Sequence, residues 1–339
     1  MLSTIYQAGL CGLLGRLYGG MGTIFVMHRV VSSKADSLHQ ALTITDAYLD
    51  HVIKYFREAG VDFISLDEVH MRLTSGKKSS RRFIALTFDD GYRDNLTHAL
   101  PVLRRHGVPA IIYVVNSAQE LTLDPWWLRL ERAIRRYDQL TLDWPNLEKR
   151  LIIDNLAKKT ETYFHLSEYI HQDLVNNRPL VERILPKVEL SDESLIIEHF
   201  MSWEELRQLA SDPLITIGAH TLSHPPLSML DETSAFTEMQ RGRAQLEDEL
   251  SGPVKHFAYP FGTRMECGHR EFALATRAGF ATAVTTRRGN IFQEHRTHCM
   301  ALPRYFLGGL DETISDAVLK VSGIPVGLGS NWMNPVIVD

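Results

Sequence analysis

Short apolar runs rich in β-branched and aromatic residues alternate along the chain with longer amphipathic stretches. Residues 83–88 form a nearly continuous apolar run, as expected of a strand that is buried on both faces. Residues 46–59 carry apolar positions at helical spacing, with Thr45 or Asp46 as the N-cap and Gly60 at the end. Repetition of this alternation predicts βα units around a parallel sheet.

The same pattern predicts about seven strands with helices between them. We expect strands at residues 23–27, 63–65, 83–88, 110–115, 214–217, 254–258, 281–285 and 302–306. We expect helices at residues 46–59, 67–73, 96–106, 232–250, 269–278 and 312–320, and one more that is capped by Ser202. The fold class is therefore α/β, and we expect a closed or nearly closed barrel whose active face lies at the C-terminal ends of the strands.

A single barrel domain is expected, interrupted by an insertion. Residues 23–118 and 201–322 carry the βα pattern, whereas residues 119–200 are helical in pattern and contain no clear strand. We interpret residues 119–200 as a helical insertion that caps the barrel. Its adjacent Trp126 and Trp127 favour core packing over stacking on a sugar.

Both ends of the chain fall outside the βα pattern. Residues 1–22 are an apolar, Gly-rich segment that lacks the basic start of a secretory signal and is interrupted by Arg16. It is too short and too broken by glycine to predict a membrane span, although a helix lying on a membrane surface is an alternative. Residues 323–339 form a C-terminal tail. We therefore predict a cytoplasmic protein, with peripheral membrane contact through the N-terminal segment as the alternative.

The charge composition argues against one class of binding partner, nucleic acid. The chain has 36 Lys and Arg against 41 Asp and Glu, a formal net charge of -5, and no basic run. We therefore do not expect nucleic acid as a partner. The three cysteines have no CxxC spacing, which does not indicate a disulfide framework and fits a reducing compartment.

Two adjacent carboxylates, Asp89 and Asp90, follow the predicted strand at residues 83–88 and precede Gly91. A single Asp at a strand end is commonly a turn former, but two neighbouring carboxylates raise each other's pKa unless a cation lies between them. A divalent metal resolves this conflict if one Asp binds it and the other stays free as a base. The glycine allows a sharp turn beneath the pair.

A second polar cluster, His220-Thr-Leu-Ser-His224-Pro, follows the predicted strand at residues 214–217. Two histidines at positions i and i+4 of one helical turn project to the same side and suit chelation of one metal. The spacing alone is a weak signal in a chain with 15 histidines. With Asp90, however, the two histidines would form a set of three protein ligands that leaves positions open for water and substrate.

A third strand runs into the tight turn Phe257-Ala-Tyr-Pro-Phe-Gly262, which by itself reads as an ordinary Pro-Gly loop. In the order TFDDG, HTLSHP and FAYPFG, the three motifs resemble the polysaccharide deacetylase family, the carbohydrate esterases with a NodB-homology domain. The resemblance covers roughly residues 24–118 and 201–306. It implies a distorted (β/α)7 barrel and metal-dependent removal of the N-acetyl group from a sugar of a polysaccharide or glycan precursor.

The resemblance also implies roles for individual residues. Asp89 would be the base that activates water, and Asp90, His220 and His224 would be the ligands of one divalent metal, with zinc as the expected ion. The backbone N–H of Phe261, which stands where the family usually has a tyrosine, would help to hold the oxyanion.

One departure from the family concerns the arginine that usually orients the base, since this chain has Ala258 at that position. Arg304, next to the last predicted strand, is our candidate replacement, because barrel neighbours could bring its guanidinium to Asp89. The alternative is a surface arginine on that strand.

A second departure concerns the general acid, because the late Leu-x-His motif that usually supplies it is not evident. His295 and His298 lie near the expected position of this motif, but neither of them stands in a Leu-x-His sequence. In the branch resembling the poly-N-acetylglucosamine deacetylases, the acid comes instead from a histidine at the end of an early strand, and His28 has that position. A carboxylate near His28 would raise its pKa and keep it protonated. The alternative is a histidine that only bonds a neighbouring carbonyl group.

Two other functions remain open at this point. One is an inactive carbohydrate-binding protein on the same scaffold, which retention of both Asp89 and Asp90 argues against. The other is an amidohydrolase that acts on a small non-sugar amide. The sequence favours a cytoplasmic glycan intermediate over an external polymer, but it does not identify the sugar.

Overall fold

A computed structural model gives the fold. It describes residues 15, 18–76, 81–142, 144, 147, 150–181, 191–308, 312–325 and 336–338. The N-terminal segment therefore lies mostly outside the described residues, as do Cys11 and most of the C-terminal tail, so membrane contact through that segment stays a prediction. Among the described helices, none is long and apolar enough to cross a membrane.

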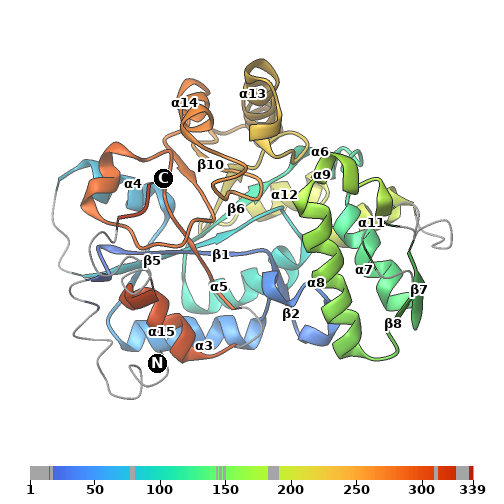
Figure 1. The fold of residues 1–339 in the computed structure, drawn as a ribbon. Helices are drawn as coiled ribbons and strands as arrows, with labels where there is room; N and C mark the ends of the chain where they lie inside the picture. Colours follow the sequence, from blue (N-terminus) through green and yellow to red (C-terminus); the bar gives the residue numbers. More distant parts are fainter. Residues whose placement is uncertain are drawn as a thin grey trace.

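An eight-stranded sheet of parallel strands forms the centre of the molecule (Figure 1). Its strands are β1 (Gly22–Met27), β4 (Asp62–Phe63), β5 (Phe83–Phe88), β6 (Ala110–Val114), β9 (Ile215–Ala219), β10 (His256–Ala258), β11 (Thr282–Val284) and β12 (Tyr305–Phe306). Their order is β11-β10-β9-β6-β5-β1-β12, and β4 also pairs with β5. Every expected strand is present, with ends that shift by up to three residues.

The sheet curls until its two ends meet. An isolated parallel bridge joins Val284 at the end of β11 to Leu302, and the N–H of Thr285 donates to the carbonyl of Leu302 at 2.9 Å. Three residues after Leu302 the chain enters β12, which pairs with β1. The expected α/β barrel is therefore confirmed, and its closure rests on this bridge rather than on a long strand pair.

Amphipathic helices cover the outside of the barrel. They are α3 (Asp46–Glu58), α4 (Leu66–Thr74), α5 (Leu100–His106), α12 (Trp203–Ala210), α13 (Glu232–Leu250), α14 (His269–Arg277) and α15 (Ile314–Ser322). Local capping explains where they begin: Thr45 accepts a hydrogen bond from the N–H of Tyr48, and Ser202 forms a capping box with Glu205. The helix expected at residues 96–106 begins instead with a π-helical turn, Asn95–Ala99.

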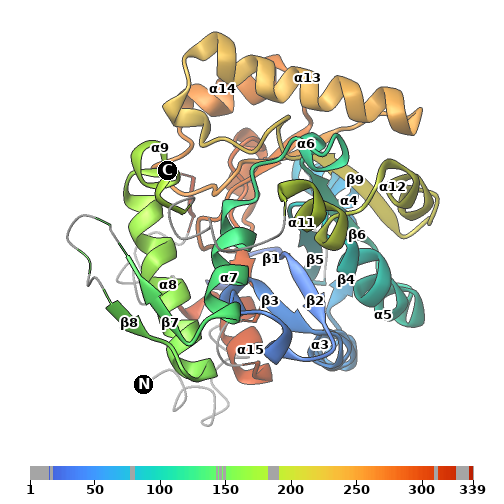
Figure 2. The same ribbon diagram turned by 90° about the vertical axis from the view of Figure 1, so that its right-hand side faces the viewer.

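The insertion contains a hairpin as well as helices, so the expectation that residues 119–200 hold no strand was wrong. Strands β7 (Gln139–Thr141) and β8 (Arg150–Ile152) pair in antiparallel fashion. The helices of this part of the chain are α6 (Asn116–Gln119), α7 (Trp126–Arg136), α8 (Leu156–Gln172), α9 (Leu174–Asn177) and α11 (Asp192–His199). Figures 1 and 2 show α7, α8 and α9 gathered at one side of the barrel.

This insertion has a hydrophobic core of its own. Trp126 on α7 packs with Tyr163 and Ile170 on α8, and Trp144 joins the same cluster. The indole N–H of Trp144 donates to the carbonyl of Leu180 at 3.1 Å. Burial of such large side chains contributes about 1.5–3 kcal/mol each, so α7 and α8 form a fixed unit rather than a loose loop.

Candidate active site

Four strands deliver the candidate residues to the same rim of the barrel. β1 leads into His28, β5 into Asp89 and Asp90, and β9 into His220, while β10 ends at Ala258. Because all of these strands are parallel, their C-terminal ends lie on one side of the sheet.

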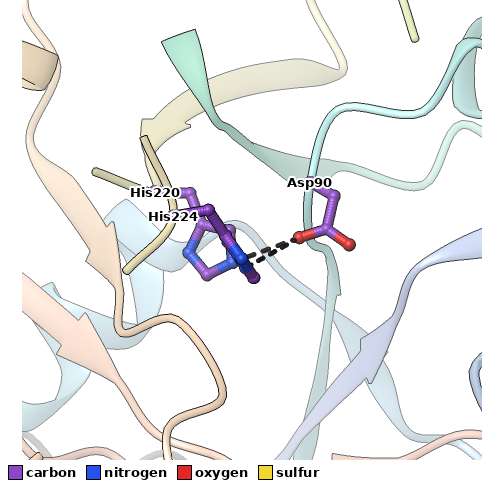
Figure 3. Close-up of side chains that lie close together, drawn as sticks. All are labelled: Asp90, His220 and His224. Atoms are coloured by element: carbon purple, nitrogen blue, oxygen red, sulfur yellow. Dashed lines mark ion pairs between the residues drawn. The ribbon is translucent and has the colours of Figure 1, made fainter. Parts of the chain in front are cut away.

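Asp90, His220 and His224 converge so closely that one ligand atom from each lies within 4.8 Å of the others. Oδ1 of Asp90 lies 3.3 Å from Nε2 of His220 and 3.4 Å from Nε2 of His224, as Figure 3 shows. These contacts lack hydrogen-bond geometry, so this buried carboxylate oxygen has no hydrogen-bond partner among the described residues. A buried charged oxygen without a donor needs a cation, and the donor set of two imidazoles and one carboxylate fits a divalent metal such as zinc.

The tautomer of His220 suits metal binding. Its Nδ1 lies 2.7 Å from the carbonyl oxygen of Ala258, which can only accept, so Nδ1 carries the proton. Nε2 of His220 faces Asp90 and His224, and in the neutral ring it is the nitrogen that can bind a metal. Although burial opposes it, the two histidine rings hold the pKa of Asp90 well below its usual range.

The backbone between the two histidines is a strained loop, so the helical turn expected from their spacing was wrong. Thr221 and His224 have φ values of 67° and 64°, and Asp90 across the site has 74°. Non-glycine residues in this region cost about 1–3 kcal/mol each and cluster at functional sites. The loop is stabilised by the N–H of His224, which donates to the hydroxyl of Thr221 at 2.9 Å.

Glu238 stabilises this loop through three hydrogen bonds, and the sequence analysis did not identify it. Its Oε2 accepts hydrogen bonds from the N–H groups of Leu222 and Ser223 at 3.0 and 2.9 Å, and its Oε1 accepts one from the Ser223 hydroxyl at 2.8 Å. No local signal in the sequence marks Glu238, because it lies on α13 among other charged residues.

Asp89 is held by Arg304. The guanidinium donates two hydrogen bonds to the carboxylate, at 2.8 and 2.7 Å, and others to the hydroxyl of Thr87 and the carbonyl of Thr285, both at 2.9 Å. Arg304 is fully buried, so the alternative of a surface arginine was wrong. Although burial opposes it, the charge of Arg304 lowers the pKa of Asp89, and the carboxylate is therefore ionised.

His28 lines the same cavity as Asp89 and Asp90 and stacks on Phe306 with the ring centroids 6.0 Å apart. Its carbonyl accepts a hydrogen bond from the Asn95 side chain at 2.8 Å, whereas its ring Nδ1 is buried without a partner among the described residues. Burial lowers the pKa of His28, and the charges of Asp90 and Asp89 offset this only in part. The two carboxylates raise this pKa as expected, but burial outweighs them, so the expectation that they keep the ring protonated was wrong.

The two late histidines lie elsewhere. His295 is buried, and its Nε2 lies 2.9 Å from the carbonyl oxygen of Ile337 while its Nδ1 accepts from the N–H of Phe292. Neither His295 nor His298 is among the residues that line the cavity.

Phe261 follows β10 in the turn that the sequence singled out, with a φ of 60°. Its ring lies 5.0 Å from that of His224, and it lines the cavity. No backbone partner for its N–H is found in the described part of the chain.

A cavity of about 480 Å³ lies above these residues. Barrel loops supply one wall and the insertion supplies the other, through residues of α7 and α8 that include Trp126, Trp127, Ser167 and His171. Trp127 donates from its indole N–H to the hydroxyl of Tyr92 at 2.8 Å, and its ring lies 5.7 Å from that of His224. The two tryptophans therefore belong both to the core of the insertion and to the wall of the site.

The chain is similar to known proteins in sequence and in fold. A family model described as polysaccharide deacetylase matches residues 76–280. Among curated proteins, a putative polysaccharide deacetylase, YxkH of Bacillus subtilis, is 35% identical over 66 residues, which are 20% of this chain and 24% of the relative. The poly-beta-1,6-N-acetyl-D-glucosamine N-deacetylase of Escherichia coli K12 is 20% identical over 221 residues, which are 65% of this chain and 24% of the relative. The matches span about a quarter of the length of these curated relatives.

Solved structures share the fold. The deacetylase PplD of Streptococcus pyogenes superposes with a TM-score of 0.58 at 16% identity, covering 88% of this chain and 97% of that one. IcaB from Ammonifex degensii gives a TM-score of 0.55 at 17% identity, covering 89% and 96%. Since these coverages are high, the similarity in fold extends over nearly the whole of both chains.

Proposed function

The chain belongs to the polysaccharide deacetylase family, and we propose that it removes the acetyl group from an N-acetylated sugar by metal-assisted hydrolysis. One observation carries this proposal: three side chains placed so that they could hold a metal ion lie next to an ionised carboxylate that is held by a buried arginine. A binding protein needs no such base, which supports an enzyme.

Asp90, His220 and His224 would hold the metal. A divalent ion bound there supplies Lewis-acid polarisation of the acetamide oxygen and lowers the pKa of water. The hydrogen bond from Nδ1 of His220 to Ala258 fixes the orientation of that ring and increases the basicity of its Nε2. Glu238 fixes the loop that carries both histidines.

Asp89 would act as the general base. It is ionised, its two oxygens are fixed by Arg304, and it lines the cavity beside Asp90. Water adds to the acetamide carbon while Asp89 accepts one of its protons. The N–H of Phe261, which has no backbone partner among the described residues, would then donate a hydrogen bond to the oxyanion that develops on the carbonyl oxygen.

His28 would act as the general acid. The C–N bond breaks as the nitrogen takes a proton from His28, and acetate and a free amino sugar are the products. The lowered pKa of His28 makes its protonated ring a stronger proton donor than an exposed histidine.

Acetate release from oligosaccharides of N-acetylglucosamine tests this function, with protein loaded with zinc and protein stripped of metal. We expect release only from the loaded protein, and a loss of about 10²–10⁴-fold in Asp89→Asn with metal content unchanged. Binding of the sugar without any release would favour the inactive carbohydrate-binding protein. Turnover of small cyclic amides in place of sugars would favour the non-sugar amidohydrolase.

A further inference from the structure

His28 stands at the point where the chain leaves the barrel sheet. β1 ends at Met27, which pairs with Phe88 on β5. The residues after His28 form β2 (Arg29–Val31), which pairs with β3 (Thr43–Thr45) in a separate sheet. Among the described residues, no backbone N–H donates to the carbonyl of His28. A buried carbonyl group needs a donor, so one must come from a side chain.

The side chain of Asn95 is that donor. Its Nδ2 lies 2.8 Å from the carbonyl oxygen of His28 and 3.2 Å from Oδ1 of Asp94, and it donates to both. Since a carbonyl oxygen can only accept, the amide faces His28 with its nitrogen. Asn95 is fully buried, so water does not compete for this contact.

Asp94 extends the same contact along the chain. Its Oδ1 also accepts from the N–H of Val30 at 3.1 Å, and its Oδ2 accepts from Nε of Arg29 at 2.9 Å. Asp94 therefore holds the two residues that follow His28, and it orients the amide that holds His28 itself.

The amide of Asn95 is an unfavourable group to bury here. Its Oδ1 has no hydrogen-bond partner among the described residues. A buried acceptor without a donor destabilises a fold, and native proteins largely avoid it. An apolar side chain of the same size would avoid this cost, so the presence of an amide is explained by the donor that it offers to His28.

The backbone is also irregular at Asn95. A π-helical turn begins there (Asn95–Ala99), in which the N–H of Leu100 donates to the carbonyl of Asn95. Pro101 follows and has no N–H, so the carbonyl of Thr97 cannot receive the bond that a regular α-helix would give it. Isolated π turns occur frequently at functional sites. The departure from α-helical geometry falls on the residue that contacts His28.

We propose that Asn95 is a positioning residue that holds His28 in place for proton donation, with Asp94 holding Asn95. The segment that carries Asp89 then also fixes His28, which sets the proposed base and the proposed acid relative to each other. This inference rests on the proposed function of His28 as the general acid. Because Asn95 acts only through His28, it matters only where the leaving group needs a proton.

Asn95→Leu and Asn95→Ala both remove the donor, and the second serves where the first folds poorly. Asn290→Leu is the matched control, because Asn290 is also buried and also donates to a backbone carbonyl, that of Val321, but does not line the cavity. The substrates are the trisaccharide of N-acetylglucosamine and p-nitrophenyl acetate, whose leaving group needs no proton. The ratio of the two activities is taken within one protein, so the fraction that is folded cancels.

We expect both Asn95 variants to lose about 10- to 100-fold in kcat on the trisaccharide with KM little changed, because a misplacement of about 1 Å can cost about 100-fold. Zinc content and activity on the ester should match those of Asn290→Leu. In a His28→Ala background, Asn95→Leu should cause no further loss on the trisaccharide, since two changes that act through one group do not add. Equal losses on the two substrates, or a further loss in the His28→Ala background, would overturn the role of Asn95.

A crystal structure of Asn95→Leu separates this inference from the proposed function. We expect the ring of His28 to leave its stacked position on Phe306. A ring that stays in place would overturn the positioning role, whether or not the protein is a deacetylase. A displaced ring, in a protein whose wild type releases no acetate, would support the positioning role and contradict the deacetylase function.

Discussion

Arg304 and Asp89 are separated by 215 residues, yet two hydrogen bonds of 2.8 and 2.7 Å join the guanidinium to the carboxylate. The bridge between Val284 and Leu302 makes this possible, since it brings the chain around residue 304 beside the end of β11. Nε of Arg304 donates to the carbonyl of Thr285 at that point. The chain segment that closes the barrel therefore places a cation beside Asp89, the base that we propose. Ala258 contributes only its carbonyl group, which pairs with His220.

Replacing Arg304 should move the acid limb of the pH profile. If Asp89 is the base, as we propose, activity falls as the pH decreases through its pKa, and the charge of Arg304 lowers that pKa. Arg304→Met removes the charge and should therefore shift the acid limb of kcat/KM to higher pH. Arg304→Lys keeps the charge but not the paired hydrogen bonds, so it should lower kcat with a smaller shift. An unshifted limb in a folded, metal-loaded Arg304→Met protein would remove Arg304 from this role.

Metal binding should depend on each of the three ligands. His224→Ala removes one imidazole and should weaken zinc binding by more than about 100-fold, because loss of a partner outside the ligand set already costs about 10- to 100-fold. Elemental analysis after dialysis measures the zinc that remains. His298→Ala is the control, since His298 does not line the cavity. Full zinc occupancy in both variants would contradict the assignment of the site.

The sequence predicted that the site residues converge, because their positions at the ends of parallel strands are enough to bring them together. Asp90 and His220 each follow a buried strand, and parallel strands in one barrel deliver their C-terminal ends to one rim. The conformation of the His220–His224 loop could not be predicted, because the helical spacing of its histidines suggested a turn that positive φ values at Thr221 and His224 replace. Those values are sustained partly by Glu238, which is 14 residues beyond His224 and has no local signature.

The hairpin and the cavity-lining residues of the insertion could not be predicted, because local sequence carries little signal for either. In β7 only Leu140 is buried, so its pattern carries too few apolar positions to indicate a strand. The residues of α8 that line the cavity likewise gain a role only once the opposite wall of the cavity is known. Core packing of Trp126 was predictable, whereas its second role in the cavity wall depends on how the insertion docks on the barrel.

Glu238 should act on the metal site without touching it. Glu238→Gln keeps the size of the side chain but weakens the hydrogen bonds from Leu222 and Ser223, so the loop should hold its histidines less firmly. We expect zinc affinity to fall by about tenfold. Glu249→Gln, on the same helix but paired with Arg207 at the surface, should leave zinc affinity unchanged. Competition with a chelator measures both; identical affinities in the two variants would show that Glu238 does not position the loop.

We predict that His28 is the general acid. It lies near the start of the chain, whereas the family resemblance places this acid in a late Leu-x-His motif. An amine leaves poorly unless it is protonated. The histidines that line the cavity outside the metal set are His28, His39 and His171, and of these His28 directly follows a strand of the barrel sheet. His28→Ala should therefore lose about 10²–10⁴-fold on an N-acetylated sugar while it keeps its zinc.

The leaving group of the substrate separates catalysis by His28 from a structural role. p-Nitrophenolate needs no proton to depart, so His28→Ala should lose far less activity on p-nitrophenyl acetate than on the N-acetylated sugar. His295→Ala is the control, because His295 bonds Phe292 and Ile337 away from the cavity. Its ratio of amide to ester activity should equal that of the wild type. Equal losses of His28→Ala on amide and ester would show that His28 supports the site through its stacking on Phe306 rather than by donating a proton.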